Sequence, residues 1–240
     1  MLQKIQNQRV HILNLGFEYK WILDSFIKSR PDKVYIIKKP DEKNEKAIET
    51  ETKIKQFLNK TKSDLKTIKF DEDIYTLVKI LKDIIYKEKN NQIYLCISAG
   101  QRDNISAFIL ASMLFNRIPK EIYLYSAKDG DFIELPYFEV KLPKKEIIET
   151  IKFLATQEEG CIKKTIRDHL FDNEFLKIEK YKDQERKNKY KDKEHAKYVK
   201  LNRAVLDPAE KDWKLIEVKG KRKGSRITLT EEGKKWAKIF

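Results

Sequence analysis

The strongest constraint on the fold of this chain is a regular alternation of β-rich runs with amphipathic stretches from Arg9 to Val140. The runs are short and rich in Val, Ile and Tyr, which predicts strands, and the stretches between them place apolar residues at helical spacing. The predicted strands are residues 9–15, 33–39, 65–70, 92–98 and 121–127. The predicted helices are residues 18–29, 44–60, 73–89 and 104–116. Such βα alternation predicts a mostly parallel sheet with helices on both faces.

The alternation ends at the turn signal "KDGD", after which residues 134–140 are expected to form an antiparallel edge strand. From Pro143 onward the sequence has helical periodicity, then two strand-like runs joined by a basic turn, then a short helix that Thr230 is expected to cap. The predicted helices before the hairpin are residues 144–157, 161–171 and 194–211. Three helices followed by a hairpin is the order of a winged helix-turn-helix module. We therefore expect two domains, residues 1–142 and 143–240.

The charge of the chain favours a polyanionic partner. Charged residues make up 38% of the sequence, and the formal net charge is +14 with a pI near 9.4. From Lys144 onward there are 27 basic and 18 acidic residues, so this smaller part carries +9 of the +14. Clustered positive charge favours DNA binding over general solubility. The alternative is that the Lys-rich composition reflects an AT-rich genome or a hot habitat.

Composition also suggests a compartment. The chain has only two cysteines, Cys96 in a predicted strand and Cys161 at a predicted helix start, which favours a reducing cytoplasm. The N-terminal residues lack the basic-then-apolar layout of a secretory signal. The apolar run "AFILASMLF" is shorter than the roughly 20 residues that a membrane span requires. We expect a cytoplasmic protein without a membrane partner.

A polar cluster without an obvious packing role follows two of the predicted strands. In an open parallel sheet, ligands bind beyond the carboxyl ends of the strands where the winding direction reverses, and the first and fourth strands are expected to meet there. Both strands end in a loop with a glycine, which permits close backbone approach, and both loops lead into a helix whose first N–H groups can hold a phosphate. We call these two loops, residues 14–18 and 98–104, the elbow. Its candidate ligand-binding residues are Asn14, Leu15, Gly16, Phe17, Glu18, Ser98, Ala99, Gly100, Gln101, Arg102 and Asn104.

Two side chains of the elbow suggest the chemistry of its ligand. Arg102 suits a phosphate, and Phe17 offers a stacking face for a base. The competing interpretation is structural, with two turn glycines and a helix cap at Asn104. Neither loop matches G-x-G-x-x-G or a Walker A motif, which argues against a dinucleotide cofactor or ATP hydrolysis.

The segments "RVHILNLGFE" and "QIYLCISAGQRDNISAFILASMLF" resemble the two signature segments of CARF domains, the CRISPR-associated Rossmann-fold sensors. The order of elements over nearly the whole chain resembles archaeal transcriptional regulators that join a CARF domain to a C-terminal winged helix. The predicted fold class is thus α/β, a Rossmann-like, mostly parallel sheet with helices on both faces, followed by a winged helix-turn-helix domain.

The resemblance implies a homodimer in antiviral defence that binds cyclic oligoadenylate across its two-fold axis. The loops that would hold this effector are Leu15–Glu18 and Ser98–Asn104. No metal and no other cofactor is expected. One departure from the family is the negative charge of Glu18 and Asp103 beside the expected phosphates, which leaves the identity of the ligand open.

A winged helix lays one helix in the major groove of duplex DNA while the hairpin wing contacts the backbone. The candidate recognition-helix residues are Lys197, Lys200, Asn202 and Arg203. The candidate wing residues are Lys221, Arg222, Lys223, Ser225 and Arg226. The alternative for the basic turn is a solvated hairpin tip. The charged stretch 177–200 is longer than the usual turn before a recognition helix and predicts either an extra helix or a loop.

Two nuclease interpretations compete with a regulator. A CARF-coupled ribonuclease needs an Arg followed at a spacing of four residues by a His, and no histidine here has an Arg at that distance. A metal-dependent DNA nuclease, activated by cyclic oligoadenylate, is the alternative that remains, because Glu217 and Lys219, with Asp207 or Asp212 upstream, match a loose Asp…Glu-x-Lys pattern. The favoured function is a ligand-responsive DNA-binding transcriptional regulator without a catalytic residue.

Overall fold

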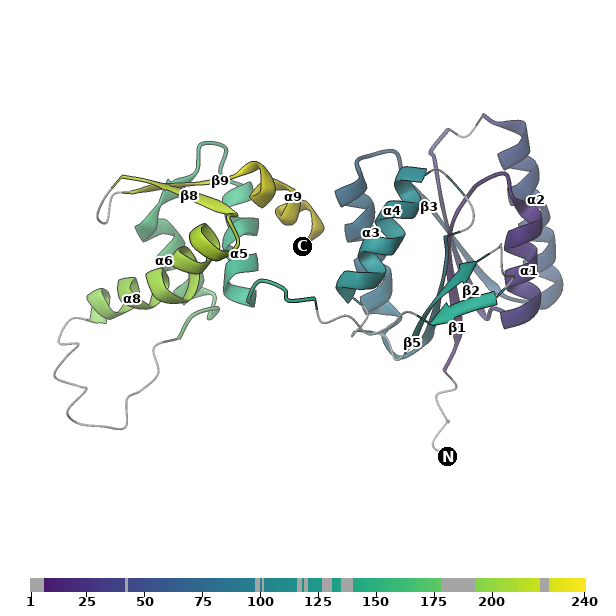
Figure 1. Cartoon of the computed structure of the whole chain (residues 1–240), viewed down its shortest axis with the longest axis horizontal. Coiled ribbons are helices and arrows are strands. Elements are labelled where there is room, and N and C mark those ends of the chain that lie inside the picture. Colours follow the sequence, from purple (N-terminus) through teal and green to yellow (C-terminus); the bar gives the residue numbers. More distant parts are fainter. Residues whose placement is uncertain are drawn as a thin grey trace. The chain divides into compact units, whose positions relative to one another are not determined.

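The computed structural model describes residues 7–41, 43–97, 100, 102–115, 118, 121–126, 131–134, 140–177, 193–220 and 225–240. For the first two residues of α4, for β5 apart from Tyr123, for β6 and for the first residue of α8, this description covers the backbone only. The chain divides into two compact units, Met1–Val140 and Lys141–Phe240 (Figure 1). Within the described residues, no helix is both long and apolar enough to cross a membrane.

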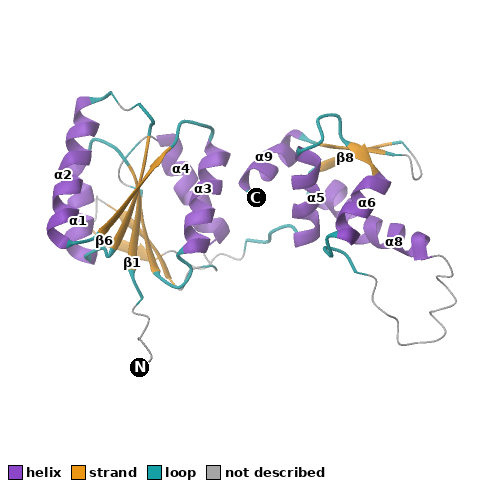
Figure 2. Ribbon diagram, turned by 180° about the vertical axis from the view of Figure 1, so that it is seen from behind, coloured by secondary structure: helices purple, strands orange, loops and turns teal. Residues whose placement is uncertain are grey.

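The N-terminal unit is a six-stranded sheet in the order β3-β2-β1-β4-β5-β6. The parallel strands are β1 (Arg9–Asn14), β2 (Lys33–Lys38), β3 (Asp64–Lys69), β4 (Gln92–Cys96) and β5 (Glu121–Ser126). The helices between them are α1 (Tyr19–Ser29), α2 (Glu45–Thr61), α3 (Ile74–Lys87) and α4 (Arg102–Phe115). Helices α1 and α2 cover one face of the sheet and α3 and α4 cover the other (Figure 2). The predicted Rossmann-like α/β fold is confirmed.

The antiparallel edge strand lies earlier than the sequence pattern predicted. Strand β6 spans Asp131–Glu134 and pairs with β5, with Asp131 opposite Ser126. The strand predicted at 134–140 therefore overlaps β6 only at Glu134, and residues 135–139 lie outside the described residues. A short connection after β5 places residues 131–134 directly opposite that strand. Pro136 has no N–H to donate to a sheet, which disfavours a strand over residues 134–140.

The central strand β1 explains why the sheet is stable between two helical layers. Its residues from Val10 to Asn14 are all buried, because helices cover both faces of the sheet. Parallel strands that are covered on both faces have nearly continuous apolar sequences, because the side chains on either face are shielded from water. On one face, Leu13 and Ile36 pack with Phe26 of α1.

The C-terminal unit is a winged helix, as predicted. Its elements before the hairpin are α5 (Lys145–Ala155), β7 (Cys161–Ile162), α6 (Lys163–Asp172), α8 (Lys193–Leu201), η2 (Asn202–Leu206) and η3 (Pro208–Asp212). The hairpin and final helix are β8 (Ile216–Lys219), β9 (Arg226–Leu229) and α9 (Glu231–Ile239). Thr230 caps α9 by accepting a hydrogen bond from the Gly233 N–H at 3.0 Å, as expected.

One prediction for this unit was wrong. Cys161 does not begin a helix but lies in the short strand β7, opposite Ile227 of β9. Strand β7 makes the sheet three-stranded, in the order β7-β9-β8, and α6 begins only at Lys163. Local periodicity could not distinguish these two apolar residues from a helix start, because the pairing strand lies more than 60 residues further along the chain.

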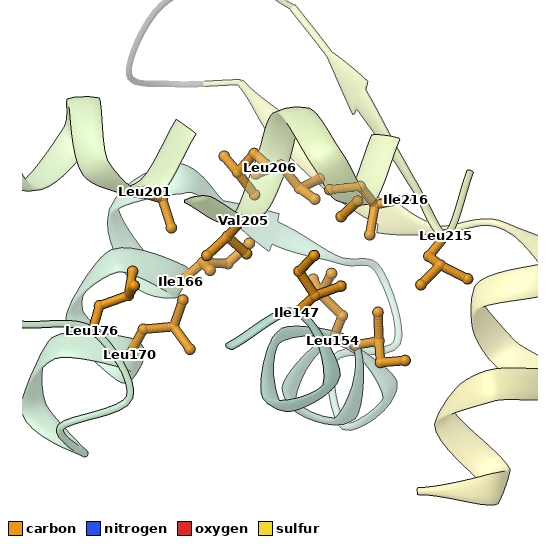
Figure 3. Packing of buried hydrophobic residues seen from close by; sticks show 13 residues of the cluster. Ile147, Leu154, Ile166, Leu170, Leu176, Leu201, Val205, Leu206, Leu215 and Ile216 are labelled. Atoms are coloured by element: carbon orange, nitrogen blue, oxygen red, sulfur yellow. The ribbon is translucent and has the colours of Figure 1, made fainter. Parts of the chain in front are cut away.

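Elements α8, η2 and η3 follow one another without a break and are together called the recognition helix. The stretches on either side of Asp207 are π-helical, and Pro208, which has no N–H to donate, lies at the start of the second one. Leu201 and Val205 of this helix face Ile166 and Leu170 of α6 in the core of the unit (Figure 3). Residues 178–192, most of the charged stretch, lie outside the described residues.

Candidate functional site

The carboxyl ends of β1 and β4 lie side by side. The two strands pair in parallel, with Leu13 opposite Cys96, so the loops that follow them begin next to each other. The strand order reverses between β1 and β4. Strands β2 and β3 continue the sheet beyond β1, whereas β5 continues it beyond β4. The helices that follow the two loops, α1 and α4, consequently cover opposite faces of the sheet (Figure 2). This is the switch point at which open α/β sheets bind ligands, and the predicted adjacency of the two strands is confirmed.

Within the elbow, three residues from the two loops lock together. Gly100 has φ +100°, and a Cβ at this position would lie 1.8 Å from Nδ2 of Asn14. Asn104 donates a hydrogen bond from Nδ2 to Oδ1 of Asn14 at 3.1 Å. Asn14 is only 3% exposed. Glycine is therefore required at position 100 both by the left-handed backbone and by the close approach, and the Asn14 side chain joins the two loops.

The other residues of the first loop divide between core and solvent. Leu15 is buried, packs against the core and donates its N–H to the Ile37 carbonyl at 2.8 Å, so its side chain does not line an open site. Gly16 is buried as well. Phe17 is 54% exposed, and its carbonyl accepts a hydrogen bond from the Tyr19 N–H at 3.0 Å. Glu18 is exposed and precedes α1 without capping it through its side chain.

The second loop is described only in part. Ser98, Ala99 and Gln101 lie outside the described residues. Arg102 is the first residue of α4, and its side chain lies outside the description. The described elbow therefore consists of residues 14–18, Gly100 and Asn104.

A buried ion pair lies at the end of β2, the strand next to β1. Lys38 Nζ is 2.7 Å from Oε2 of Glu51, and Lys55 Nζ is 2.8 Å from Oε1 of the same carboxylate. Burial alone would raise the pKa of Glu51, but hydrogen bonds from the two lysines outweigh it and hold the pKa below the ordinary value. The charge of Lys38 is thus already balanced within the protein.

The sheet beneath the elbow contains a buried histidine. His11 lies in β1, stacks on Tyr94 at 4.8 Å between ring centroids and contacts Ser29 Oγ at 2.5 Å. Burial, with a smaller contribution from Arg9, lowers its pKa to about 3. The ring is therefore neutral at physiological pH, and its place in a strand is as predicted. Of the other two histidines, His195 is exposed, while His169 stacks on Phe153 at 4.1 Å.

The four candidate residues of the recognition helix do not face the same way. Lys197 Nζ lies 3.2 Å from Oε1 of Glu194 and 5.5 Å from the Phe171 ring centroid, next to α6. Lys200 donates to the carbonyl of Lys177.

Asn202 and Arg203 lie further along the recognition helix. Asn202 accepts a hydrogen bond from Lys163 Nζ at 3.4 Å. Arg203 is exposed, and its guanidinium has no hydrogen-bond or ion-pair partner among the residues that the structure describes. Of the four side chains, Arg203 is thus the most available to a ligand.

The two described wing residues have different roles. Ser225 is 2% exposed and donates from Oγ to the Gly220 carbonyl at 3.0 Å, which closes the hairpin. Arg226 is exposed and binds Glu159, with Nη2 2.7 Å from Oε2 and Nε donating to the carbonyl at 2.9 Å. Lys221, Arg222 and Lys223 lie outside the described residues.

Sequence reasoning missed one residue that shapes this surface. Arg167 of α6 is 6% exposed, its guanidinium carbon lies 4.6 Å from the Tyr198 ring centroid, and it pairs with Asp168 and Glu194. It holds the first turn of the recognition helix against α6. No local signal marked it, because an arginine on an amphipathic helix is usually exposed and its partner Glu194 lies 27 residues further along the chain.

The acidic residues of the nuclease pattern do not form a metal site. Glu217 is exposed on β8 and pairs with Lys219 at 3.6 Å, whereas Asp207 pairs with Lys211 at 3.4 Å. No three His, Cys, Asp or Glu side chains among the described residues lie close enough together to hold a metal ion. The Asp…Glu-x-Lys pattern therefore gains no support from the fold.

The fold and the elbow define a protein with a Rossmann-like α/β unit, whose loops converge at the switch point of the sheet, and a winged helix. The chain belongs to the family described as HFX_2341_N-like, N-terminal, whose model matches residues 9–129, half of the chain. Residues 146–240 match the DUF6293 C-terminal winged helix domain. No curated protein matches the sequence significantly.

Among solved structures, the chain is similar to Csm6 of Enterococcus italicus bound to cyclic hexa-2'-fluoro-hexa-dAMP, with 11% identity, a TM-score of 0.41 and coverage of 82% of this chain and 62% of that chain. It is similar to Can2 of Sulfobacillus thermosulfidooxidans in complex with cyclic tetra-adenylate, with 11% identity, a TM-score of 0.40 and coverage of 96% of this chain and 61% of that chain. A type III CRISPR defence DNA nuclease activated by cyclic oligoadenylate matches with 10% identity, a TM-score of 0.36 and coverage of 93% and 37%. The chain thus spans less than two thirds of the length of each.

Proposed function

We propose that this protein is a ligand-responsive, DNA-binding transcriptional regulator that acts as a homodimer in the cytoplasm. The N-terminal unit binds an anionic, base-bearing ligand at the elbow, and the winged helix binds duplex DNA. The observation that carries the proposal is the junction of Asn14, Gly100 and Asn104, which brings the two polar loops together at the switch point of the sheet.

The chemistry of the elbow supports a nucleotide ligand. Phe17 is an exposed aromatic side chain on which a base can stack, and the side chain of Glu18 leaves the first turn of α1 uncapped, where N–H groups can bind a phosphate. The resemblance of the elbow segments to CARF signatures favours cyclic oligoadenylate. Asn14 then acts as a positioning residue, because its amide is occupied between the two loops.

Helix α4 supports the homodimer. Residues 104–116 contain no charged side chain, in a chain of which 38% is charged. Ile109 is 39% exposed, Leu110 and Met113 are half-buried, and the exposed Ser106 beside them is uncharged, so this outward face is uncharged and mostly apolar. Such a face favours self-association. Because α4 begins at the elbow, a two-fold axis along it brings two elbows together around one ring-shaped ligand.

The DNA-binding part of the proposal is supported by the winged helix fold and its charge. Arg203 is exposed on the recognition helix, and the basic turn connects β8 and β9 where a wing contacts the DNA backbone. A ligand that bridges two subunits changes the separation of their winged helices, and this separation sets the spacing of the DNA half-sites that fit.

Calorimetry of the full chain with cyclic tetra-adenylate and cyclic hexa-adenylate tests the elbow. Phe17→Ala is expected to weaken binding about tenfold, the usual effect of losing one base-stacking aromatic ring. Ile27→Ala is the matched control, since Ile27 is 58% exposed near the other end of α1. Equal affinity of Phe17→Ala and the control would contradict binding at the elbow.

Sedimentation velocity and DNA titration test the rest of the proposal. Ile109→Glu places a charge on the apolar face of α4 and is expected to give a monomer. Fluorescence anisotropy of a labelled promoter duplex, with and without saturating ligand, measures the coupling. DNA affinity that does not change with ligand would remove the regulatory role, and a dimeric Ile109→Glu variant would remove the α4 interface.

A further inference from the structure

In the recognition helix and beside the wing strand β9, a carboxylate forms ion pairs with nearby cations. Glu194 lies in the first turn of the recognition helix, and Glu159 lies in the turn before β7, next to the wing strand β9. We propose that these two carboxylates occupy positions that DNA phosphates take when duplex binds, and that they limit the affinity for nonspecific DNA. This inference rests on the proposed DNA-binding function.

The first position is built around Glu194. Its Oε2 contacts Nη1 of Arg167, and its Oε1 lies 3.2 Å from Nζ of Lys197. Arg167 is held in place by Asp168 and by the ring of Tyr198, so its guanidinium does not depend on Glu194 for its orientation. One carboxylate therefore bridges an ordered guanidinium and an ammonium group, which is the donor arrangement that a phosphate group also accepts.

The second position is built around Glu159. Its carboxylate binds Nη2 of Arg226 at 2.7 Å, and its own backbone carbonyl binds Nε of the same guanidinium. The backbone contact remains when the carboxylate leaves. Arg226 thus keeps its orientation and can bind a phosphate through Nη2.

Exposure makes both exchanges feasible. The side chain of Glu194 is 51% exposed and that of Glu159 is 82% exposed. The Glu159–Arg226 pair is open to water on both sides and contributes little to folding, so a phosphate can replace Glu159 at small cost to the protein. The guanidinium of Arg167 is enclosed, but it keeps its ion pair with Asp168 when the exposed carboxylate of Glu194 leaves. Until then, each carboxylate repels the DNA backbone. Binding then depends more on contacts to bases, which distinguish an operator from other DNA.

The experiment measures the affinity of the full chain for a random-sequence 20-base-pair duplex by fluorescence anisotropy over a series of salt concentrations. Glu194→Gln removes the charge and keeps the size and the hydrogen-bonding oxygen. It is expected to bind about fivefold more tightly, the effect of one unit charge a few ångströms from a phosphate in water. Its affinity is also expected to fall more steeply with salt, because additional phosphate contacts release more counterions.

Two further variants make the result specific. Glu159→Gln does not touch Arg167 and is expected to act in the same direction with a smaller increase, since Glu159 is more exposed. Glu231→Gln is the matched control, because Glu231 forms an exposed ion pair with Lys234 on α9 at the i,i+3 spacing that also separates Glu194 from Lys197. It is expected to bind like the wild type, and thermal unfolding of each variant shows whether the fold is retained.

The outcomes separate the two proposals. If the wild type binds duplex but Glu194→Gln and Glu159→Gln bind no more tightly than Glu231→Gln, the exchange of carboxylate for phosphate is wrong and the DNA-binding function stands. If neither the wild type nor any variant binds duplex at low salt, the proposed DNA-binding function fails and this inference fails with it.

Discussion

The two units of this protein build their candidate sites in opposite ways. The elbow of the N-terminal unit depends on buried contacts, since Asn14 is enclosed, Gly100 leaves no room for a side chain and Asn104 closes the junction. The surface of the winged helix depends on exposed charges, with Arg203 open to solvent and Arg226 paired at the surface.

This difference predicts different responses to substitution. Buried polar and steric contacts lose a large free energy when one partner changes, because water cannot replace it. Exposed charges change stability little and act on binding in a salt-dependent way. Substitutions of Asn14, Gly100 or Asn104 are therefore expected to destabilise the N-terminal unit, whereas substitutions on the winged helix surface are expected to change only affinity.

The largest expected effect is that of Gly100→Ala. The left-handed backbone and the 1.8 Å approach to Asn14 both oppose a methyl group, so we expect a loss of about 3 kcal/mol in the stability of the N-terminal unit. Pulse proteolysis in urea, with fragments identified by mass, reports each unit separately. Gly220→Ala is the control in the winged helix, because there φ is +95° but the nearest atom to a Cβ is 3.7 Å away. A smaller loss for Gly100→Ala than for Gly220→Ala would contradict the locked junction.

Acidification is the next largest perturbation and should also distinguish the units. The pKa of His11 is lowered to about 3 in the folded state, so the unfolded chain binds the proton more readily and stability is lost as pH falls below about 6.5. Between pH 7 and pH 5 we expect a loss of about 2 kcal/mol in the N-terminal unit.

The carboxylate of Glu88 responds to acid only at lower pH. Burial raises the pKa of Glu88, but hydrogen bonds from Tyr35, Lys33 and Asn91 outweigh it and hold the pKa below its ordinary value. Stability from Glu88 is therefore lost only below about pH 4.5.

Two histidine variants test the assignment to His11. In the His11→Gln variant the difference in stability between pH 7 and pH 5 should nearly vanish, whereas His195→Gln, at an exposed position of the other unit, should keep that difference. An unchanged pH response of His11→Gln would overturn this assignment.

Asn14→Ala tests whether the two loops are coupled. Removing the acceptor of the Asn104 hydrogen bond is expected to cost about 1 to 2 kcal/mol in pulse proteolysis. The same change removes Nδ2 and Cγ, the two atoms nearest to a Cβ at position 100. In the Asn14→Ala background, Gly100→Ala should therefore cost about 1 kcal/mol less than in the wild type. Additive losses would mean that the two loops are not in contact.

The smallest effect is expected on the winged helix surface. Arg203→Ala should leave stability unchanged and weaken duplex binding about fivefold, because an exposed cation contributes roughly 1 kcal/mol to binding a phosphate. Lys211→Ala, on the same helix but paired with Asp207, is the matched control. Anisotropy at two salt concentrations measures both variants. A loss of folding stability in Arg203→Ala, or equal affinities of the two variants, would break the contrast between a buried and an exposed site.

The sequence predicted most of the fold because local patterns determine most of it. The bounds of α1 and β2 lie within one residue of the predicted ones, since amphipathic and β-rich runs are visible without tertiary information. The adjacency of β1 and β4 was also predictable, because the winding of parallel sheets follows a general rule. The short strand β7 was not, because a two-residue strand has no period of its own.

The candidate site was predictable in position but not in the roles of its residues. Asn14 and Leu15 were expected to face a ligand, but Asn14 joins the two loops and Leu15 packs in the core. On the winged helix, the sequence indicated Lys197 and Arg226 but not the carboxylates of Glu194 and Glu159 that pair with them. Glu159 lies 67 residues from Arg226 and leaves no local signal. Glu194 is only three residues from Lys197, but its second partner, Arg167, lies 27 residues away, so the bridge between the two cations is not visible in the local pattern.

The sequence by itself determined the order of most helices and strands, the two kinds of unit and the edge of the sheet where the polar loops meet, because periodicity and turn residues act over short distances. Only the tertiary structure decided which side chains of those loops are enclosed and which cations are already paired. Asn14 and Asn104 are 90 residues apart and Glu159 and Arg226 are 67 apart, so their contacts exist only after the strands have set their register.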